Sequence, residues 1–118
     1  MSTLRRTSIS STAPSHWKPL LEALPEPVHI SVEGTYQYVN PAGAALLGAD
    51  TPDDLLGCHI SDFIPDSATL KHLQQRAARV CEAGEPPEPY EHEIVALDGS
   101  RRIVESRSVP IVYDGQPA

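Results

Sequence analysis

The sequence predicts an α+β fold, in which an antiparallel sheet carries helices on one face. Two pairs of strand-like segments support this, because each pair flanks a short turn, Glu33-Gly34 in the first and Asp98-Gly99 in the second. Between the pairs lies a helical block whose longest segment, 67–83, is amphipathic. Strand pairs separated by one helical block are typical of a sheet with helices packed against it.

Both strand pairs carry local signals of β-structure. Residues 28–32 alternate apolar and polar side chains, the period of a half-buried strand, and residues 35–39 are β-branched and aromatic. Residues 90–97 and 101–112 form the second pair, and a further turn follows at 113–115. We expect each pair to form a hairpin.

The helices are marked by their starts and stops. Asn40 precedes Pro41, a combination typical of a helix N-terminus, and Gly48 supplies a stop. The expected helical segments are 17–24, 41–47, a short turn at 51–57, a bent stretch at 59–64, and 67–83.

Composition and charge exclude several classes of function. The chain has 118 residues, which suits one domain, and a formal net charge of −7. A pI near 5.0 argues against binding to nucleic acid or to an anionic membrane surface, because both require clustered cations. No apolar run approaches the ~20 residues of a membrane span, and no signal peptide is evident. We therefore expect a cytoplasmic protein whose cysteines, Cys58 and Cys81, are reduced.

A series of short motifs runs through the chain from residue 20 onwards: Leu-Glu-Ala-Leu-Pro-Glu-Pro-Val at 21–28, Gly-Thr-Tyr-Gln-Tyr-Val-Asn-Pro-Ala-Gly at 34–43, Leu-Leu-Gly at 46–48, Asp-Leu-Leu-Gly at 54–57, Ser-Asp-Phe-Ile at 61–64, Asp-Gly-Ser at 98–100, Val-Pro-Ile at 109–111 and Tyr-Asp-Gly at 113–115. In this order and spacing the motifs resemble those of a PAS domain over residues 20–118. The resemblance implies a five-stranded antiparallel sheet with helices on one face. It also implies a non-catalytic sensory module of a larger signalling protein, such as a sensor histidine kinase of a two-component system or a diguanylate cyclase.

The expected organisation is a flexible leader, 1–14, and a PAS-like domain, 15–118, truncated at its C-terminus. The sequence ends where the last strand of the family begins, and in the family that strand lies between the first and fourth strands. The β-branched stretch 7–12 of the leader could fill the gap, in cis or in a swapped dimer, or the gap stays open. The expected partners are a second copy of the chain and an attached effector domain.

The candidate site is an apolar ligand pocket between the sheet and the helices, where members of the family bind small molecules. Alternatively, the same side chains fill the core, and the module acts in dimerisation or signal relay without a ligand. The pocket candidates are Val28, Ile30, Tyr38, Leu47, Leu56, Ile60, Phe63, Ile64, Leu73, Ala77, Val80, Ile94 and Val104.

No catalytic residue and no metal site is expected. Photosensing members carry a cysteine where Ile60 stands here, and Cys58 lies two places too early, which argues against flavin. His72 lies on the long helix but off its apolar face, so we expect it to be solvated, and a haem sensor remains the weaker alternative. His59 and Asp62 lie one helical turn apart, but two ligands without a third do not make a metal site.

The polar residues of the strands are expected at the surface. His29 and His92 are interpreted as surface histidines. Glu91 and Glu93 share one face of their strand, and we expect them to face solvent or an arginine of the facing strand, such as Arg102.

Overall fold

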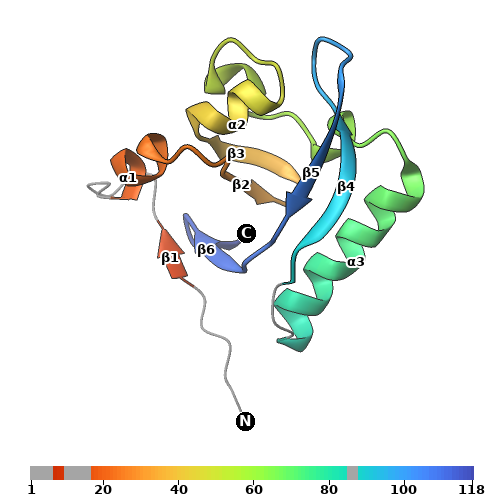
Figure 1. Ribbon diagram of the computed structural model, residues 1–118. Helices are drawn as coiled ribbons and strands as arrows, with labels where there is room; N and C mark the ends of the chain where they lie inside the picture. Colours follow the sequence, from red (N-terminus) through yellow and green to blue (C-terminus); the bar gives the residue numbers. More distant parts are fainter. Residues whose placement is uncertain (1–6, 10–16, 85–87) are drawn as a thin grey trace.

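The computed structural model describes residues 7–9, 17–84 and 88–118. Helix α3 is the longest element and runs beside strand β4 (Figure 1). In chain order the elements are β1 (Thr7–Ile9), α1 (Trp17–Ala23), β2 (His29–Val32), β3 (Thr35–Val39), α2 (Pro41–Leu46), the 3₁₀ turns η1 (Pro52–Leu55) and η2 (Ile60–Phe63), α3 (Ser67–Ala83), β4 (Tyr90–Val95), β5 (Arg101–Ser106), β6 (Ile111–Tyr113) and β7 (Gln116–Pro117).

The expected α+β fold is confirmed. Strands β2 and β3 pair antiparallel, as do β4 and β5, and the helical block lies between the two pairs in sequence. Within the described residues, no backbone ladder joins the two pairs to each other. Contacts between side chains and loops must therefore hold the pairs in place.

The β2–β3 hairpin turns at Glu33 and Gly34, whose φ angles are 51° and 83°. Both angles are positive, as a two-residue type I′ turn requires. The second edge of β3 is covered by the segment 57–60. The Tyr36 N–H donates to the Cys58 carbonyl at 2.9 Å, and the Ile60 N–H donates to the Gly34 carbonyl at 2.8 Å. This covered edge of β3 is not free to recruit another strand.

The β4–β5 hairpin turns at the expected Asp98-Gly99. Gly99 has a φ of 84°, and the Asp98 carboxylate accepts from the Ser100 N–H at 2.9 Å. The strand expected over 101–112 is wrong in its length, because β5 ends at Ser106 and the chain is irregular until Ile111. The buried Pro110 lies in this break, and proline has no N–H to donate to a ladder.

The third group of strands involves the leader. Strand β6 pairs in parallel with β1 and antiparallel with β7 on its other edge. Residues 7–9 of the expected leader thus form one edge of a separate three-stranded sheet, in which β7 occupies the other edge of β6. The described residues show no pairing of the leader with β2, so filling of the gap by the leader, one of the alternatives considered above, is not seen among them. The rest of the leader lies outside the described residues.

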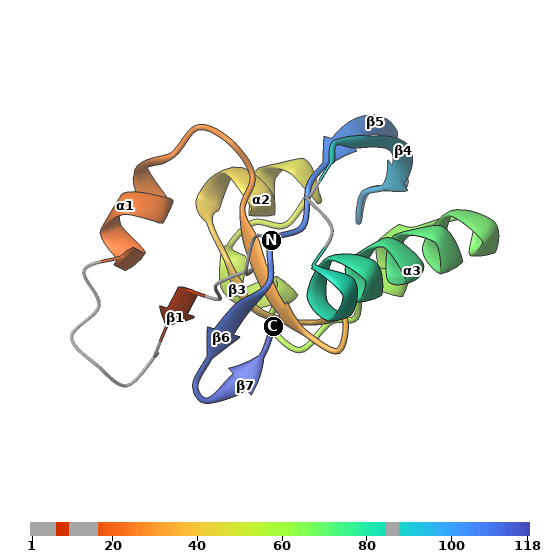
Figure 2. The ribbon, with the colours of Figure 1, turned by 90° about the horizontal axis from the view of Figure 1, so that it is seen from below.

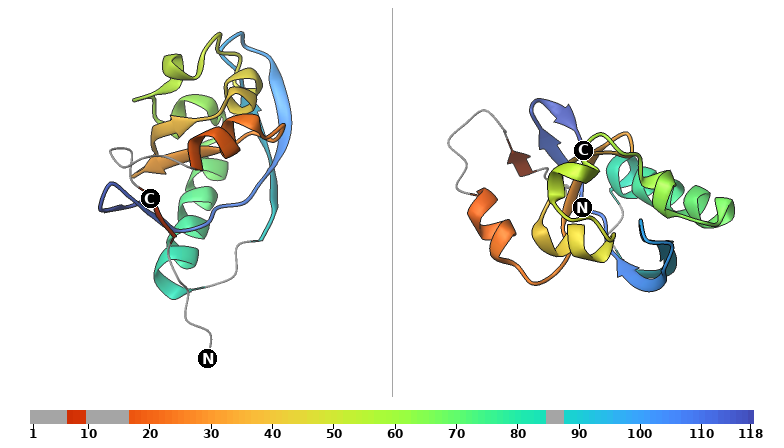
Figure 3. Two further views of the ribbon diagram at one scale, coloured as in Figure 1. Left: turned by 90° about the vertical axis from the view of Figure 1, so that its left-hand side faces the viewer. Right: turned by 90° about the horizontal axis from the view of Figure 1, so that it is seen from above.

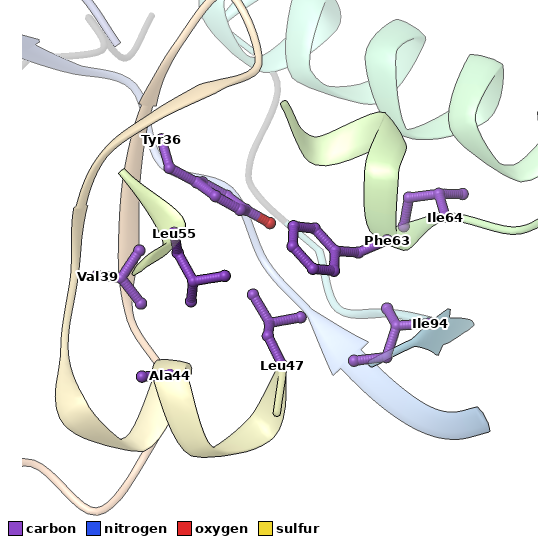
Figure 4. Close-up of a cluster of buried hydrophobic side chains, with 8 residues drawn as sticks. All are labelled: Tyr36, Val39, Ala44, Leu47, Leu55, Phe63, Ile64 and Ile94. Atoms are coloured by element: carbon purple, nitrogen blue, oxygen red, sulfur yellow. The ribbon is translucent and has the colours of Figure 1, made fainter. Parts of the chain in front are cut away.

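The inner core lies where β3, α2, η1, η2 and β4 meet (Figure 4). Leu55 and Phe63 have exposed fractions of 0% and 2%. The rings of Tyr36 and Phe63 lie 6.0 Å apart. Burial, with smaller contributions from Cys58 and Asp62, raises the pKa of Tyr36 to about 12, so its phenol stays neutral. The buried members of this cluster are Tyr36, Val39, Ala44, Leu47, Leu55, Phe63, Ile64 and Ile94.

A second cluster covers the opposite face of the β2–β3 pair. Helices α1 and α3 lie on opposite sides of that pair (Figure 2). Trp17 of α1 packs edge-on against Tyr38 at 5.1 Å and against Tyr113 of β6 at 6.3 Å between ring centroids. The buried residues of this outer cluster are Ile30, Tyr38 and Tyr113. Helix α1 and strand β6 therefore pack together in one hydrophobic cluster.

Asn40 connects three parts of the chain at the start of α2, and its side chain is fully buried. Its Oδ1 accepts from the N–H of Val28 at 2.9 Å and of Gly43 at 2.8 Å. Its Nδ2 donates to the carbonyls of Leu21 at 3.0 Å and Glu26 at 2.9 Å. All four hydrogen-bonding capacities of the amide are used, so these bonds offset the cost of removing it from water.

The C-terminal end of α2 holds the β4–β5 hairpin. The Leu97 N–H donates to the Leu47 carbonyl at 2.8 Å, and Arg102 Nη1 donates to the carbonyls of Leu46 at 2.6 Å and Ala45 at 3.1 Å. The last carbonyls of a helix have no partner within the helix, and a cation is favourable there. The tip of the hairpin accordingly lies beside α2 (Figure 3).

Replacing Asn40 by alanine should destabilise the fold by about 3 kcal/mol or more, because two N–H groups and two carbonyls lose their partner in a buried site. Chemical denaturation of the purified chain measures this. Gln37→Ala is the control, since Gln37 is exposed and its substitution should cost less than about 0.5 kcal/mol. Equal stability of the two variants would contradict the role given to Asn40.

Candidate functional site

A small pocket lies between α3 and the end of β5. It leaves about 10 Å³ for the centre of a water-sized group, enough for about one water molecule. Ser108 is exposed, so the pocket reaches solvent on that side. The lining residues are Leu73, Arg76, Val80, Ser106 and Ser108.

A row of polar and aromatic side chains borders this pocket and joins α3 to the hairpin. The ring of Tyr90 in β4 lies 4.5 Å from that of His72 and 5.7 Å from that of His92. The Arg76 guanidinium lies over the Tyr90 ring, 5.0 Å from its centroid. We call His72, Arg76, Tyr90, His92 and Ser106 the polar seam. It is the side-chain link between the long helix and β4–β5.

The register of the hairpin places the strand residues of the seam together. Tyr90 is paired with Ser106, and His92 stands two residues after Tyr90 on the same face. His92 Nε2 lies 2.9 Å from Ser106 Oγ, and His92 Nδ1 lies 3.3 Å from the Glu93 carbonyl. The hairpin thus directs a histidine and a hydroxyl toward α3.

The electrostatics of the seam keep His92 neutral. Burial lowers the pKa of His92 below 6.5, and the nearby Arg76 cation lowers it further, whereas the Glu93 carbonyl acts in the opposite direction. Arg76 also donates to the Glu88 carbonyl. Among the residues that the structure describes, no carboxylate forms an ion pair with Arg76.

Most of the predicted pocket residues belong to the inner core. Leu47, Phe63, Ile64 and Ile94 are buried in its cluster. The partly buried residues of the prediction that pack against it are Ile60, Leu73 and Val104. Val80 is buried and lines the pocket, and Ala77 and Val28 are half-buried. Of the predicted set, only Leu73 and Val80 line the α3–β5 pocket.

Three of the predicted pocket residues are placed elsewhere. Ile30 and Tyr38 lie in the outer cluster, because α1 supplies a second apolar cover for the sheet and they face it. An extra residue in β3, Gln37, forms a bulge opposite Ile30, so that Tyr36 and Tyr38 face opposite sides despite their spacing of two. Leu56 is 44% exposed, since its neighbour Leu55 takes the buried position.

Sequence reasoning missed the polar half of the site. Arg76, Tyr90, Ser106 and Ser108 were not among the candidates, because polar residues on an amphipathic helix or a strand are usually solvated. The available signal was the register set by the Asp98-Gly99 turn. Counting back from that turn puts Tyr90 opposite Ser106.

Several polar residues differ from their expected surroundings. His72 and His92 are half-buried in the seam rather than solvated. His29 keeps exposed surface, but its ring lies 4.8 Å from that of Tyr36 and desolvation lowers its pKa, so it is not fully solvated. Glu93 pairs with Arg101 at 2.6 Å and not with Arg102, because successive strand residues point to opposite faces and Arg102 points toward α2.

His59 and Asp62 have structural roles at the start of η2. The His59 Nδ1 accepts from the Ser61 N–H at 3.1 Å, and its Nε2 lies 3.2 Å from the Glu33 carbonyl. Asp62 accepts from the His59 N–H at 3.3 Å. Within the described residues, no group of three or more potential metal ligands comes together. Cys58 is a free thiol, and the side chain of Cys81 lies outside the described residues.

The comparison with known families decides the identity of the domain. The sequence profile of the PAS fold matches residues 21–118. The chain belongs to the PAS fold family. A curated relative, sporulation kinase A of Bacillus subtilis (strain 168), is 33% identical over 101 residues. That match covers 84% of this chain but only 16% of the length of the kinase.

Solved PAS domains share the fold. The PAS domain of a protein from Colwellia psychrerythraea superposes with a TM-score of 0.67 at 17% identity, covering 79% of this chain and 77% of its own. The PAS domain of an HTR-like protein from Haloarcula marismortui gives 0.64 at 24% identity, with 85% and 80% covered. The PAS domain of a LuxR-family transcriptional regulator from Burkholderia thailandensis, solved in complex with ethanol, gives 0.64 at 16% identity, with 75% and 77% covered.

These findings confirm the predicted family and fold class. The chain is a PAS sensory domain, and its kinship with a kinase supports a role in signal transduction. Of the helices in the described part of the chain, none has the length and apolar character needed to cross a membrane.

Acid should weaken the fold partly through His92. Its pKa is lower in the folded chain than the ordinary 6.5, so the unfolded chain binds more protons below that pH, and stability falls as pH drops through the interval below 6.5. In His92→Gln, which keeps a hydrogen-bonding group without titrating, this fall should be smaller. Denaturation curves between about pH 5 and pH 8 measure the stability of both chains. The contributions of the other histidines cancel when the variant is compared with the wild type. Identical pH profiles would refute the assignment.

Proposed function

We propose that this PAS domain senses a small organic molecule, rather than haem or flavin, and regulates an effector attached to it, such as a histidine kinase or a cyclic-dinucleotide enzyme. The observation that carries the proposal is the pocket between α3 and β5. It combines the apolar side chains of Leu73 and Val80 with an arginine and two serine hydroxyls. Apolar walls with a few convergent polar groups are typical of small-molecule sites.

A ligand there could alter the position of the hairpin. Within the described residues, the polar contacts of α3 with β4 are the tilted His72–Tyr90 ring pair and the Arg76 guanidinium over the Tyr90 ring. Leu73 of α3 also packs against the inner core, to which Ile94 of β4 belongs. β5 continues through Pro110 into β6, whose Tyr113 packs on Trp17 of α1. A ligand that favours one placement of the hairpin would shift the population of α1 placements as well.

The relatives support this proposal. Sporulation kinase A is a kinase, and the matched portion is a small part of its length, as expected of a regulatory module joined to further domains. The Burkholderia PAS domain was solved in complex with ethanol, so this fold admits a small molecule.

Native mass spectrometry of the gently purified chain should reveal a bound small molecule. Unfolding and refolding the chain should remove that mass and lower the thermal midpoint, because a ligand that binds only the folded state stabilises it by mass action. Adding back the released small-molecule fraction should restore both. An unchanged mass with an unchanged midpoint would contradict ligand sensing and favour a relay module with a filled core.

A second function, signal relay through a homodimer, is favoured by the outer surface of α1. Leu20 of α1 is 70% exposed, and Leu24, the residue that directly follows the helix, is 43% exposed. Trp17 and Leu21 of α1 pack against the outer cluster instead. We propose that this apolar stripe contacts a second copy of the chain. The two functions are compatible, because α1 is also linked to β6.

Leu20→Glu should weaken self-association at least tenfold, on the order of 1.4 kcal/mol, because a carboxylate replaces an apolar side chain in the contact. Light scattering after size exclusion, over a range of concentrations, measures the dimer. Leu97→Glu is the matched control, since Leu97 is 58% exposed at the tip of the β4–β5 hairpin. A monomeric wild-type chain, or equal effects of both variants, would overturn the relay proposal.

A further inference from the structure

Arg76 occupies an unusual position for a cation in this chain. The chain carries 16 acidic and 9 basic residues, and in the described part of it Arg101 and Arg102 form ion pairs with carboxylates. Arg76 is half-buried, lines the α3–β5 pocket and, among the described residues, forms no ion pair. The acidic residues of the facing hairpin, Glu91 and Glu105, are exposed on its other side.

The neighbours of Arg76 hold its side chain in place without neutralising it. Its guanidinium stacks on Tyr90 and donates to the Glu88 carbonyl. A guanidinium has five N–H donors, and these contacts leave donors for a ligand. Stacking also presents its planar edge, which suits the two oxygens of a carboxylate.

The rest of the pocket provides hydroxyl donors and a little apolar surface. Ser106 and Ser108 stand across from Arg76, and Leu73 and Val80 form the remaining wall. The space holds one group about the size of water, so one carboxylate oxygen enters it and the other stays at its open side. A larger ligand must therefore place its carboxylate inwards and extend toward solvent past the exposed Ser108.

We propose that the pocket binds the carboxylate group of a small organic acid, with Arg76 as the charged partner and the hydroxyls of Ser106 and Ser108 as donors. This inference rests on the proposed ligand-sensing function and names the class of ligand. Leu73 and Val80 contact the first carbons of the acid.

Ligand binding also determines which ring nitrogen of His92 carries the hydrogen. Ser106 has one O–H, and it can donate either to His92 Nε2 or to the ligand. When the carboxylate accepts from Ser106, the 2.9 Å contact persists only if Nε2 carries a hydrogen and donates to Ser106 Oγ. The charged and titratable groups around this ring are His72 and Arg76 of α3 and Tyr90 of its own strand. Ligand binding is thus reported by the ring nitrogen of His92.

The test is a titration of the ¹⁵N-labelled chain with sodium acetate, against sodium chloride at equal ionic strength. Acetate should produce saturable shifts of the amides of Leu73, Arg76, Ser106 and Ser108 and move the His92 Nε2 signal to its protonated position. In Arg76→Gln the apparent Kd should rise at least about tenfold, because a charge-assisted hydrogen bond is lost. Lys71→Gln removes a cation from the exposed side of the same helix and should leave the Kd unchanged.

Ser106→Ala is the second variant, in case Arg76→Gln fails to fold, and it too should weaken acetate binding. Absence of saturable shifts with acetate, equal shifts with chloride, or equal affinity in the pocket variants and Lys71→Gln would each overturn the inference. If mass spectrometry shows a bound neutral molecule while acetate fails, only the carboxylate assignment is wrong. If neither experiment detects a ligand, the sensing function fails with it.

Discussion

The buried amide of Asn40 is the contact on which the arrangement of the domain depends. It binds the end of α1, the connection at 26–28 and the first turn of α2 at once, through four hydrogen bonds. Gly43 is required beside it, because an added Cβ would lie 2.9 Å from Val39 Cγ1 and 3.2 Å from Asn40 Oδ1. The opposite end of α2 binds Arg102 and Leu97 of the hairpin. A helix of six residues therefore connects α1, β2–β3 and β4–β5, which share no backbone ladder in the described residues.

The domain combines a rigid inner core with a polar seam whose contacts can change at lower cost. The inner core around Leu55 and Phe63 is closely packed, and opening a cavity there costs several kcal/mol. The polar seam is half-exposed, and each of its contacts contributes on the order of 1 kcal/mol. A change in the seam is therefore the less costly way for α3 and the hairpin to move relative to each other, while both ends of α2 keep their partners.

The sequence predicted where helices and strands lie better than it predicted which side of the sheet each side chain faces, and the reasons are physical. The ends of α3 follow from Asp66 and Gly84, which act within one turn of the backbone, so they are visible locally. The side of the sheet to which Ile30 points depends on α1 and on the bulge at Gln37, and both are properties of the folded chain. Likewise, the sequence does not show which of the adjacent Leu55 and Leu56 is buried, because the conformation of the turn decides it. The fold class does not depend on which face a single side chain takes, whereas the choice of residues for a pocket does.

The outer cluster shows how the pocket and the proposed dimer surface are related. Trp17 touches Tyr38 of β3 and Tyr113 of β6, and so contacts both the part of the chain fixed by α2 and the strand that follows the pocket. Among the described residues, the Nε1 of Trp17 and the hydroxyl of Tyr38 are buried without a hydrogen-bond partner, which makes this contact less stable than its apolar area suggests. A contact that contains unpaired polar groups contributes little net stabilisation, and so it opposes a displacement of β6 only weakly. Movement of the hairpin would therefore be absorbed at α1 rather than in the core, and the exposed Leu20 lies on α1, with Leu24 directly after it.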